Sequence, residues 1–151
     1  MNLKKFLIAF MMLTSCALSF AGVADDADAA LAHWAAAYTS NNVDDIVGSY
    51  WADAVLLGTV SPVMSEGESA IRKYFSPVVN SGNRNAIGER RMIVINDSMV
   101  LITGFYEFTR MKNGVASLGP SRFTMLMEKR GSVWRIRHHH SSPHVQPVTP
   151  P

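Results

Sequence analysis

Three consecutive histidines near the end of the chain are the residues best suited to chemistry. An imidazole can ligate a metal, act as a general acid or base, or gain a positive charge near about pH 6. Alternation along a strand places His138 and His140 on one face, together with Trp134 and Ile136. We therefore expect an apolar strand face that ends in two titratable groups.

A β-hairpin must position these histidines. Residues 121–130 and 133–140 both alternate, and Gly131 between them can supply the positive φ of a tight turn. On the first strand, Phe123 and Met125 share one face. The sequence Ser-Ser-Pro after the last histidine is expected to end the second strand.

Upstream of this hairpin, helical patterns come first and strand patterns follow, which is typical of an α+β fold. Acidic residues at 25–28 predict a helix start, and Trp34 and Tyr38 follow at helical spacing. A short helix is expected at Asp44 and a third from Glu66 to Phe75. The expected strands are 51–60, 87–96, 99–111, 116–128 and 133–140, the last four as a meander.

The amino terminus has the pattern of a secretory signal peptide. A short basic start precedes the apolar run Phe6–Leu13, which is too short to span a bilayer. Two processing sites are open: removal of residues 1–21, or removal of residues 1–15 with Cys16 lipidated. We expect a periplasmic or secreted protein, bound to a membrane only if it is lipidated at Cys16.

The net charge gives no reason to expect binding to nucleic acid. The chain has 14 basic and 12 acidic residues, and Lys4 and Lys5 in the signal peptide account for the difference. The pI of 8.9 therefore reflects the leader in part. Cys16 is the only cysteine, so the fold has no disulfide within the chain.

The length of 151 residues suits one domain with a single core. We place that domain at residues 25–143. The proline-rich segment 144–151 is predicted to be a flexible tail.

Several motifs in order resemble the NTF2-like superfamily over about residues 27–143. Within it they are most similar to the bacterial SgcJ/EcaC (SnoaL-like) branch, which is related to the association domain of the calcium/calmodulin-dependent kinase II. The motifs are Asp53–Ser61 followed by Ala70–Phe75, then Arg122-Phe123-Thr124, Gly131, Trp134, Ile136 and His139-His140-Ser141-Ser142.

The resemblance implies a cone, in which N-terminal helices pack on a curved antiparallel sheet of four to six strands. It also implies one cavity inside the cone. The candidate ligand-binding residues are Trp34, Tyr38, Trp51, Tyr106, Arg122, His138 and His140.

Each candidate also has a structural interpretation. The aromatic residues can be plain core, and the histidines can bond to backbone groups at a strand end. Arg122 can bind an anion, or it can pair with Glu89, Glu107 or Glu128 across the sheet.

The predicted function is to bind a small molecule in the cone cavity. One alternative is a small hydrolase, isomerase or cyclase, since the resemblance implies a His/Asp pair such as His138 with Asp53. Another alternative is an oligomerisation domain without catalysis. Two arginines of the kinase association domain fall at Tyr106 and Met125, which puts that domain's preference for acidic ligands in doubt here.

No glycine-rich nucleotide loop is present, and we expect no cofactor. We also expect no metal, because the histidines lack a third ligand nearby in sequence. Both faces of the late strands are apolar, as at Ile102 and Leu101, so the helices can cover only one of them. A homodimer or larger homo-oligomer is the expected way to cover the other.

Overall fold

The computed structural model describes residues 3–145, with side chains from residue 22 onward. The fold is α+β, as predicted, with two helices at the start, a third helix after the first two strands, and the four longest strands at the end. Every predicted helix and strand is present, whereas β2 was not anticipated. The elements are α1 (Leu3–Ser40), α2 (Val43–Gly48), β1 (Tyr50–Leu57), β2 (Met64–Glu66), α3 (Gly67–Phe75), a single 3-10 turn η1 (Ser76–Val78), β3 (Arg84–Asn96), β4 (Met99–Lys112), β5 (Val115–Arg130) and β6 (Val133–Pro143).

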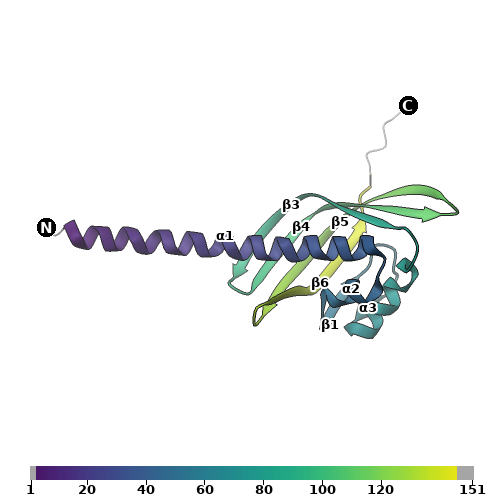
Figure 1. The fold of residues 1–151 in the computed structure, drawn as a ribbon, viewed down its shortest axis with the longest axis horizontal. Coiled ribbons are helices and arrows are strands. Elements are labelled where there is room, and N and C mark those ends of the chain that lie inside the picture. Colours follow the sequence, from purple (N-terminus) through teal and green to yellow (C-terminus); the bar gives the residue numbers. More distant parts are fainter. Residues whose placement is uncertain (1–2, 146–151) are drawn as a thin grey trace, which may run out of the picture.

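The described strands form one sheet in the order β2-β1-β6-β5-β4-β3. Strands β3 to β6 are the predicted antiparallel meander, with Asn113, Gly114 and Gly131 at positive φ in two of its turns. Strand β1 pairs in parallel with β6 and is the one parallel neighbour in this sheet. The last described strand, β6, therefore lies inside the sheet (Figure 1).

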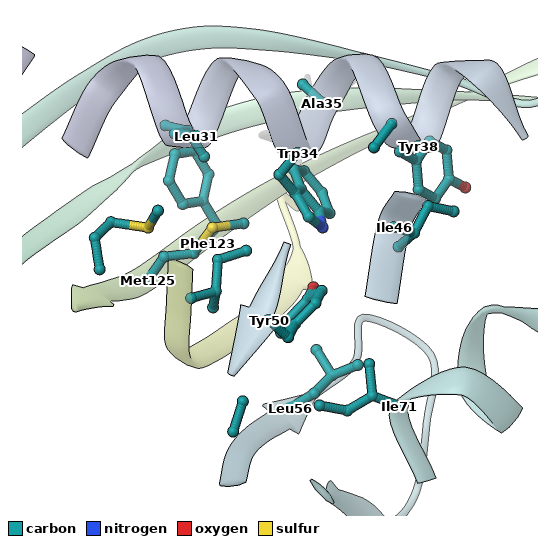
Figure 2. Close-up of a cluster of buried hydrophobic side chains, with 14 of the residues drawn as sticks. Leu31, Trp34, Ala35, Tyr38, Ile46, Tyr50, Leu56, Ile71, Phe123 and Met125 are labelled. Carbon is teal, nitrogen blue, oxygen red and sulfur yellow. The ribbon is translucent and has the colours of Figure 1, made fainter. Parts of the chain in front are cut away.

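The helices cover one face of the curved sheet, and α1 runs across it (Figure 1). Ala27, Leu31, Trp34 and Tyr38 recur every three to four residues along α1, and all four are buried. Figure 2 shows Leu31 and Trp34 directed from α1 toward the strands, where Met125 lies. Each large apolar side chain buried here contributes roughly 1.5–3 kcal/mol relative to exposure.

The predicted start of this helix at residues 25–28 is wrong, because α1 begins at Leu3. Residues 3–24 contain no proline and a single glycine, Gly22, so nothing in the sequence ends the helix there. Asp28 instead accepts two hydrogen bonds from Arg90 of β3, both 2.5 Å long. This bidentate ion pair ties α1 to the edge of the sheet.

The predicted signal peptide lies outside the residues whose side chains are described, and so does Cys16. Along the described part of the chain, no helix combines the length and the apolar character needed to cross a membrane. The predicted tail lies outside the description from residue 146 onward. Its first residue, His144, stacks on Phe105 with the ring centroids 4.6 Å apart.

Candidate binding site

A bulge in β6 decides which histidine faces the core. Leu126 of β5 pairs with His138, whereas the next residue, Met127, pairs with Ile136. Arg137 is therefore an extra residue on β6 with no partner in the β5 register. Beyond it, the side chains of β6 change faces.

The expectation that His138 and His140 share a face with Trp134 and Ile136 is wrong for this reason. His139 occupies the core side of β6 and is 2% exposed. His138 and His140 lie on the other side of the sheet, away from the helices, which we call the outer face. The imidazole inside the core is the one that simple alternation places outside.

His139 is held between two tyrosine hydroxyls. Its Nδ1 lies 2.8 Å from the Tyr50 hydroxyl oxygen, and its Nε2 lies 3.1 Å from that of Tyr106. Trp34 of α1 packs edge-on against the imidazole with a centroid distance of 5.2 Å. One residue from each of β1, β4, β6 and α1 therefore meets at this point of the core.

Burial keeps all three groups neutral. It lowers the pKa of His139 to about 3, and the neighbouring imidazoles of His138 and His140 add to that effect. Burial likewise raises the pKa of Tyr50 and of Tyr106 above the ordinary value for a phenol. At neutral pH His139 therefore offers one donor and one acceptor.

The neighbouring groups favour one direction for the protons. The indole N–H of Trp34 opposes the rise that burial causes in the pKa of Tyr50, although no hydrogen bond joins the two groups. Figure 2 shows the indole nitrogen on the side of Tyr50. We assign Tyr50 as donor to Nδ1 of His139, which leaves Nε2–H to donate to Tyr106.

The hydroxyl of Tyr106 can then donate onward. Ser141 and Thr59 both oppose the rise that burial causes in the pKa of Tyr106, and their own hydroxyls hydrogen-bond to each other. Hydrogen bonds therefore join Tyr50, His139 and Tyr106, and the hydrogen-bonded pair of Thr59 and Ser141 comes next. Thr59 is the member that reaches a cavity.

This cavity has a volume of about 210 Å³ and opens beside α1, α3 and β4; we call it the aromatic cavity. Apolar side chains form much of its wall, and hydroxyl, amide and guanidinium groups converge on it. Its lining residues are Tyr38, Thr59, Val60, Tyr74, Phe75, Pro77, Val78, Asn83, Phe108 and Arg110.

The sequence candidates divide between two faces of the sheet. Tyr38 lines the aromatic cavity, while Trp34 and Tyr106 lie in the core next to His139. The remaining candidates, Trp51, Asp53, Arg122, His138 and His140, lie on the outer face. The aromatic cavity therefore brings together only part of the predicted set.

Asp53 is engaged by arginines. Its carboxylate accepts a hydrogen bond from Arg130 at 3.0 Å and lies 3.7 Å from the guanidinium of Arg137. The hydrogen bond from Arg130 lowers the pKa of Asp53. Among the described residues, no hydrogen bond joins Asp53 to His138, so the hypothetical acid–base pair is not assembled.

Two arginine guanidinium groups pack against Trp51 on the same face. The guanidinium carbons of Arg130 and Arg135 lie 4.7 and 5.1 Å from its ring centroid. Its indole N–H donates to the backbone carbonyl of Glu128 at 3.0 Å. These contacts account for Trp51 without a ligand.

Arg122 donates from Nε to the Ser142 hydroxyl at 3.0 Å. Of the two alternatives for Arg122, pairing with Glu89, Glu107 or Glu128 is wrong, since within residues 22–145 no carboxylate lies within ion-pair distance of Arg122. Arg122 and His140 share a shallow outer hollow of about 250 Å³. No three His, Cys, Asp or Glu side chains in the described chain gather as a metal site would require.

Sequence reasoning missed Thr59, Tyr74, Arg110 and His139. A signal for Arg110 existed, because it lies four residues after Tyr106 on the same strand and therefore on the same face. No local signal marks His139, since the bulge that turns it inward is set by pairing with β5.

Comparison with known proteins agrees with this architecture. Residues 27–146 match the SnoaL-like domain family. A protein from Xanthomonas campestris, named as a calcium/calmodulin dependent protein kinase II association domain, is 33% identical, with a TM-score of 0.70 over 74% of this chain and 80% of that one. No curated protein matches the sequence.

More distant structures share the fold alone. A ketosteroid isomerase-like protein from Erwinia carotovora is 16% identical, with a TM-score of 0.68 over 82% of this chain and 97% of its own. An NTF2-like protein from Novosphingobium aromaticivorans is 11% identical, with a TM-score of 0.67 over 94% and 90% of the two chains. The chain, with its helices packed on a curved six-stranded sheet, belongs to the SnoaL-like family of the NTF2-like superfamily.

Proposed function

We propose that this SnoaL-like domain binds a small molecule in the aromatic cavity. The observation that carries the proposal is the composition of the cavity wall, in which Phe75 and Phe108 lie beside the hydroxyls of Tyr38 and Tyr74. An apolar wall with a few convergent polar groups is the usual construction of a ligand site.

The size of the cavity limits the ligand. Drug-sized ligands occupy pockets of roughly 300–1,000 Å³, whereas an apolar cavity of about 150 Å³ is enough for benzene. A volume of about 210 Å³ therefore suits a single ring with one or two substituents. Phe75 and Phe108 offer faces and edges for such a ring to pack against.

A binding role fits the geometry better than the His/Asp mechanism. Asp53 and His138 lie on the outer face, and the arginine contacts of Asp53 keep its carboxylate ionised. His139 is buried and neutral, both its ring nitrogens are bonded to tyrosine hydroxyls, and it does not line the aromatic cavity. The buried polar groups next to the cavity can hold the Thr59 hydroxyl in a fixed orientation, as a binding site requires.

Ligand-observed NMR with a library of single-ring fragments tests the proposal. Val60 lines the opening and is 72% exposed, so Val60→Trp can close the aromatic cavity without disturbing the core. Val115→Trp is the matched control, since Val115 is 67% exposed and lies in the β4–β5 hairpin. Fragments should lose binding in the first variant and keep it in the second. An absence of hits, or hits that Val60→Trp leaves unchanged, would contradict the proposal.

We further propose that the protein is exported to the periplasm or secreted. The basic start and the short apolar run before two processing sites support this. Intact-mass measurement in the native host should show a chain that begins at Gly22, or at Cys16 with attached lipid. Recovery of the full chain from Met1 would count against export.

A further inference from the structure

The aromatic cavity contains one cation, Arg110. Arg110 follows Phe108 by two residues on β4, and its guanidinium carbon lies 5.8 Å from the Phe108 ring centroid. On β5, Gly119 faces it, and a methyl group added there would lie 2.9 Å from Nη1 of Arg110. The absence of a side chain at Gly119 therefore makes room for the guanidinium.

No opposite charge balances Arg110 within the cavity. Arg110 is the only charged residue in the lining. Across residues 22–145, no carboxylate lies within ion-pair distance of its guanidinium. Its positive charge acts on the cavity, because it opposes the rise that burial causes in the pKa of both Tyr38 and Tyr74.

The polar groups around Arg110 are arranged as donors. The Oδ1 of Asn83 accepts a hydrogen bond of 2.9 Å from the backbone N–H of Met111. Its amide nitrogen remains as a donor, and the Asn83 side chain opposes the rise that burial causes in the pKa of Tyr38. Because burial raises the pKa of Tyr38, its hydroxyl stays protonated and can donate.

Resting on the proposed binding function, we propose that the aromatic cavity selects small single-ring carboxylates, with the carboxylate on Arg110 and the ring against Phe75 and Phe108. A guanidinium presents parallel N–H donors that match a carboxylate. A hydroxyl such as that of Tyr38 can donate a further hydrogen bond to a carboxylate oxygen. The class of ligand is therefore an aromatic or cyclic acid rather than a neutral ring.

The same residues disfavour an anion with several charges. The wall holds one cation, and much of the remainder is aliphatic or aromatic. A second negative charge would be removed from water without a partner, which is costly.

Benzoate and benzamide form the test pair, because they share shape and differ in charge. In NMR titrations at neutral pH, benzoate should bind the natural protein about tenfold to a hundredfold more tightly than benzamide. Arg110→Gln should reduce that ratio to near one while benzamide binding persists. Lys112→Gln, which removes a charge two residues further along β4, outside the cavity lining, should leave the ratio unchanged.

Gly119→Ala tests the same geometry without changing charge. The added methyl group must displace the guanidinium, so benzoate should weaken while benzamide does not. If benzoate shows no preference, or its preference survives Arg110→Gln, the carboxylate inference is wrong although the cavity remains a binding site. If neither probe nor any fragment binds, the proposed function itself fails.

Discussion

The hydroxyl oxygen of Tyr50 and Nδ1 of His139 lie 2.8 Å apart, across the parallel pair of β1 and β6 and 89 residues apart in sequence. Both side chains are almost completely buried. The hydrogen bond is compatible only with a neutral imidazole if Tyr50 donates, as assigned. The stability of the core therefore depends on His139 remaining unprotonated.

Acidification should destabilise the protein through His139. Its pKa is about 3 when folded and 6.5 in its ordinary state, so below about pH 6.5 the unfolded chain takes up a proton that the folded chain does not. The free energy of unfolding should therefore fall with pH, by about 2 kcal/mol between pH 7 and pH 5.

Urea unfolding between pH 7 and pH 5 measures the fall in the free energy of unfolding. In His139→Gln, most of this fall should disappear. Imidazole chemical shifts in the natural protein give a second readout, which needs no variant. A His139 ring that becomes protonated near pH 6 in the folded protein would contradict the assignment.

Removing the hydroxyl of Tyr106 should leave the Nε2–H of His139 without an acceptor. Tyr106 is 3% exposed, so water cannot take its place. We expect Tyr106→Phe to lower the free energy of unfolding by about 1–3 kcal/mol. Tyr74→Phe is the control, since Tyr74 lines the open cavity and should cost less than about 1 kcal/mol. Equal costs for the two variants would argue against a buried hydrogen-bond chain.

Gly58 allows Tyr74 to form the wall of the aromatic cavity. A methyl group added at Gly58 would overlap the Tyr74 ring, whereas one added at Gly48 meets no atom within 4 Å. Gly58→Ala should therefore displace Tyr74, destabilise the fold by about 1–3 kcal/mol and weaken fragment binding. Gly48→Ala should change stability by less than about 1 kcal/mol. Thermal unfolding with a bound fragment measures both effects, and similar behaviour of the two variants would refute the role of Gly58.

A row of side chains that carry no formal charge crosses the outer face of the sheet. The strand registers place Ile93, Leu101, Leu126, His138 and Val55 side by side. We propose that a second copy of this chain covers the row, because two-fold symmetry lays the same apolar surface on itself.

Light scattering should then give the mass of a dimer at micromolar concentration. Leu126→Asp, at the centre of the row, should shift the protein to monomer, while Val115→Asp in the β4–β5 hairpin should not. Circular dichroism must show that both variants remain folded. A natural protein that is monomeric under these conditions would exclude the dimer.

The elements with a clear local pattern could be predicted from the sequence. The β4–β5 turn at Asn113-Gly114 and the β5–β6 turn at Gly131 have residues that favour positive φ, and the flanking strands alternate. The amphipathic spacing of Trp34 and Tyr38 likewise marks the buried side of α1.

The features that local patterns do not encode were missed. After Ile136, β6 continues Arg-His-His-His, and no apolar residue there reveals which face is inside. The bulge at Arg137 and the parallel pairing with β1 are set by distant strands. For this reason the sequence predicts His138 and His140, rather than His139, on the inner face. It also suggests Asp53 as a cavity residue, although Asp53 lies on the outer face.

The position of β6 also determines when the domain can fold. Because β6 lies between β1 and β5, β1 cannot join the sheet until β6 has been synthesised. Such long-range pairing slows folding relative to a chain with local contacts. Until β6 pairs, β1 and β5 each keep an unpaired strand edge, and such edges can pair with another chain, so shortening the protein before residue 133 should promote aggregation.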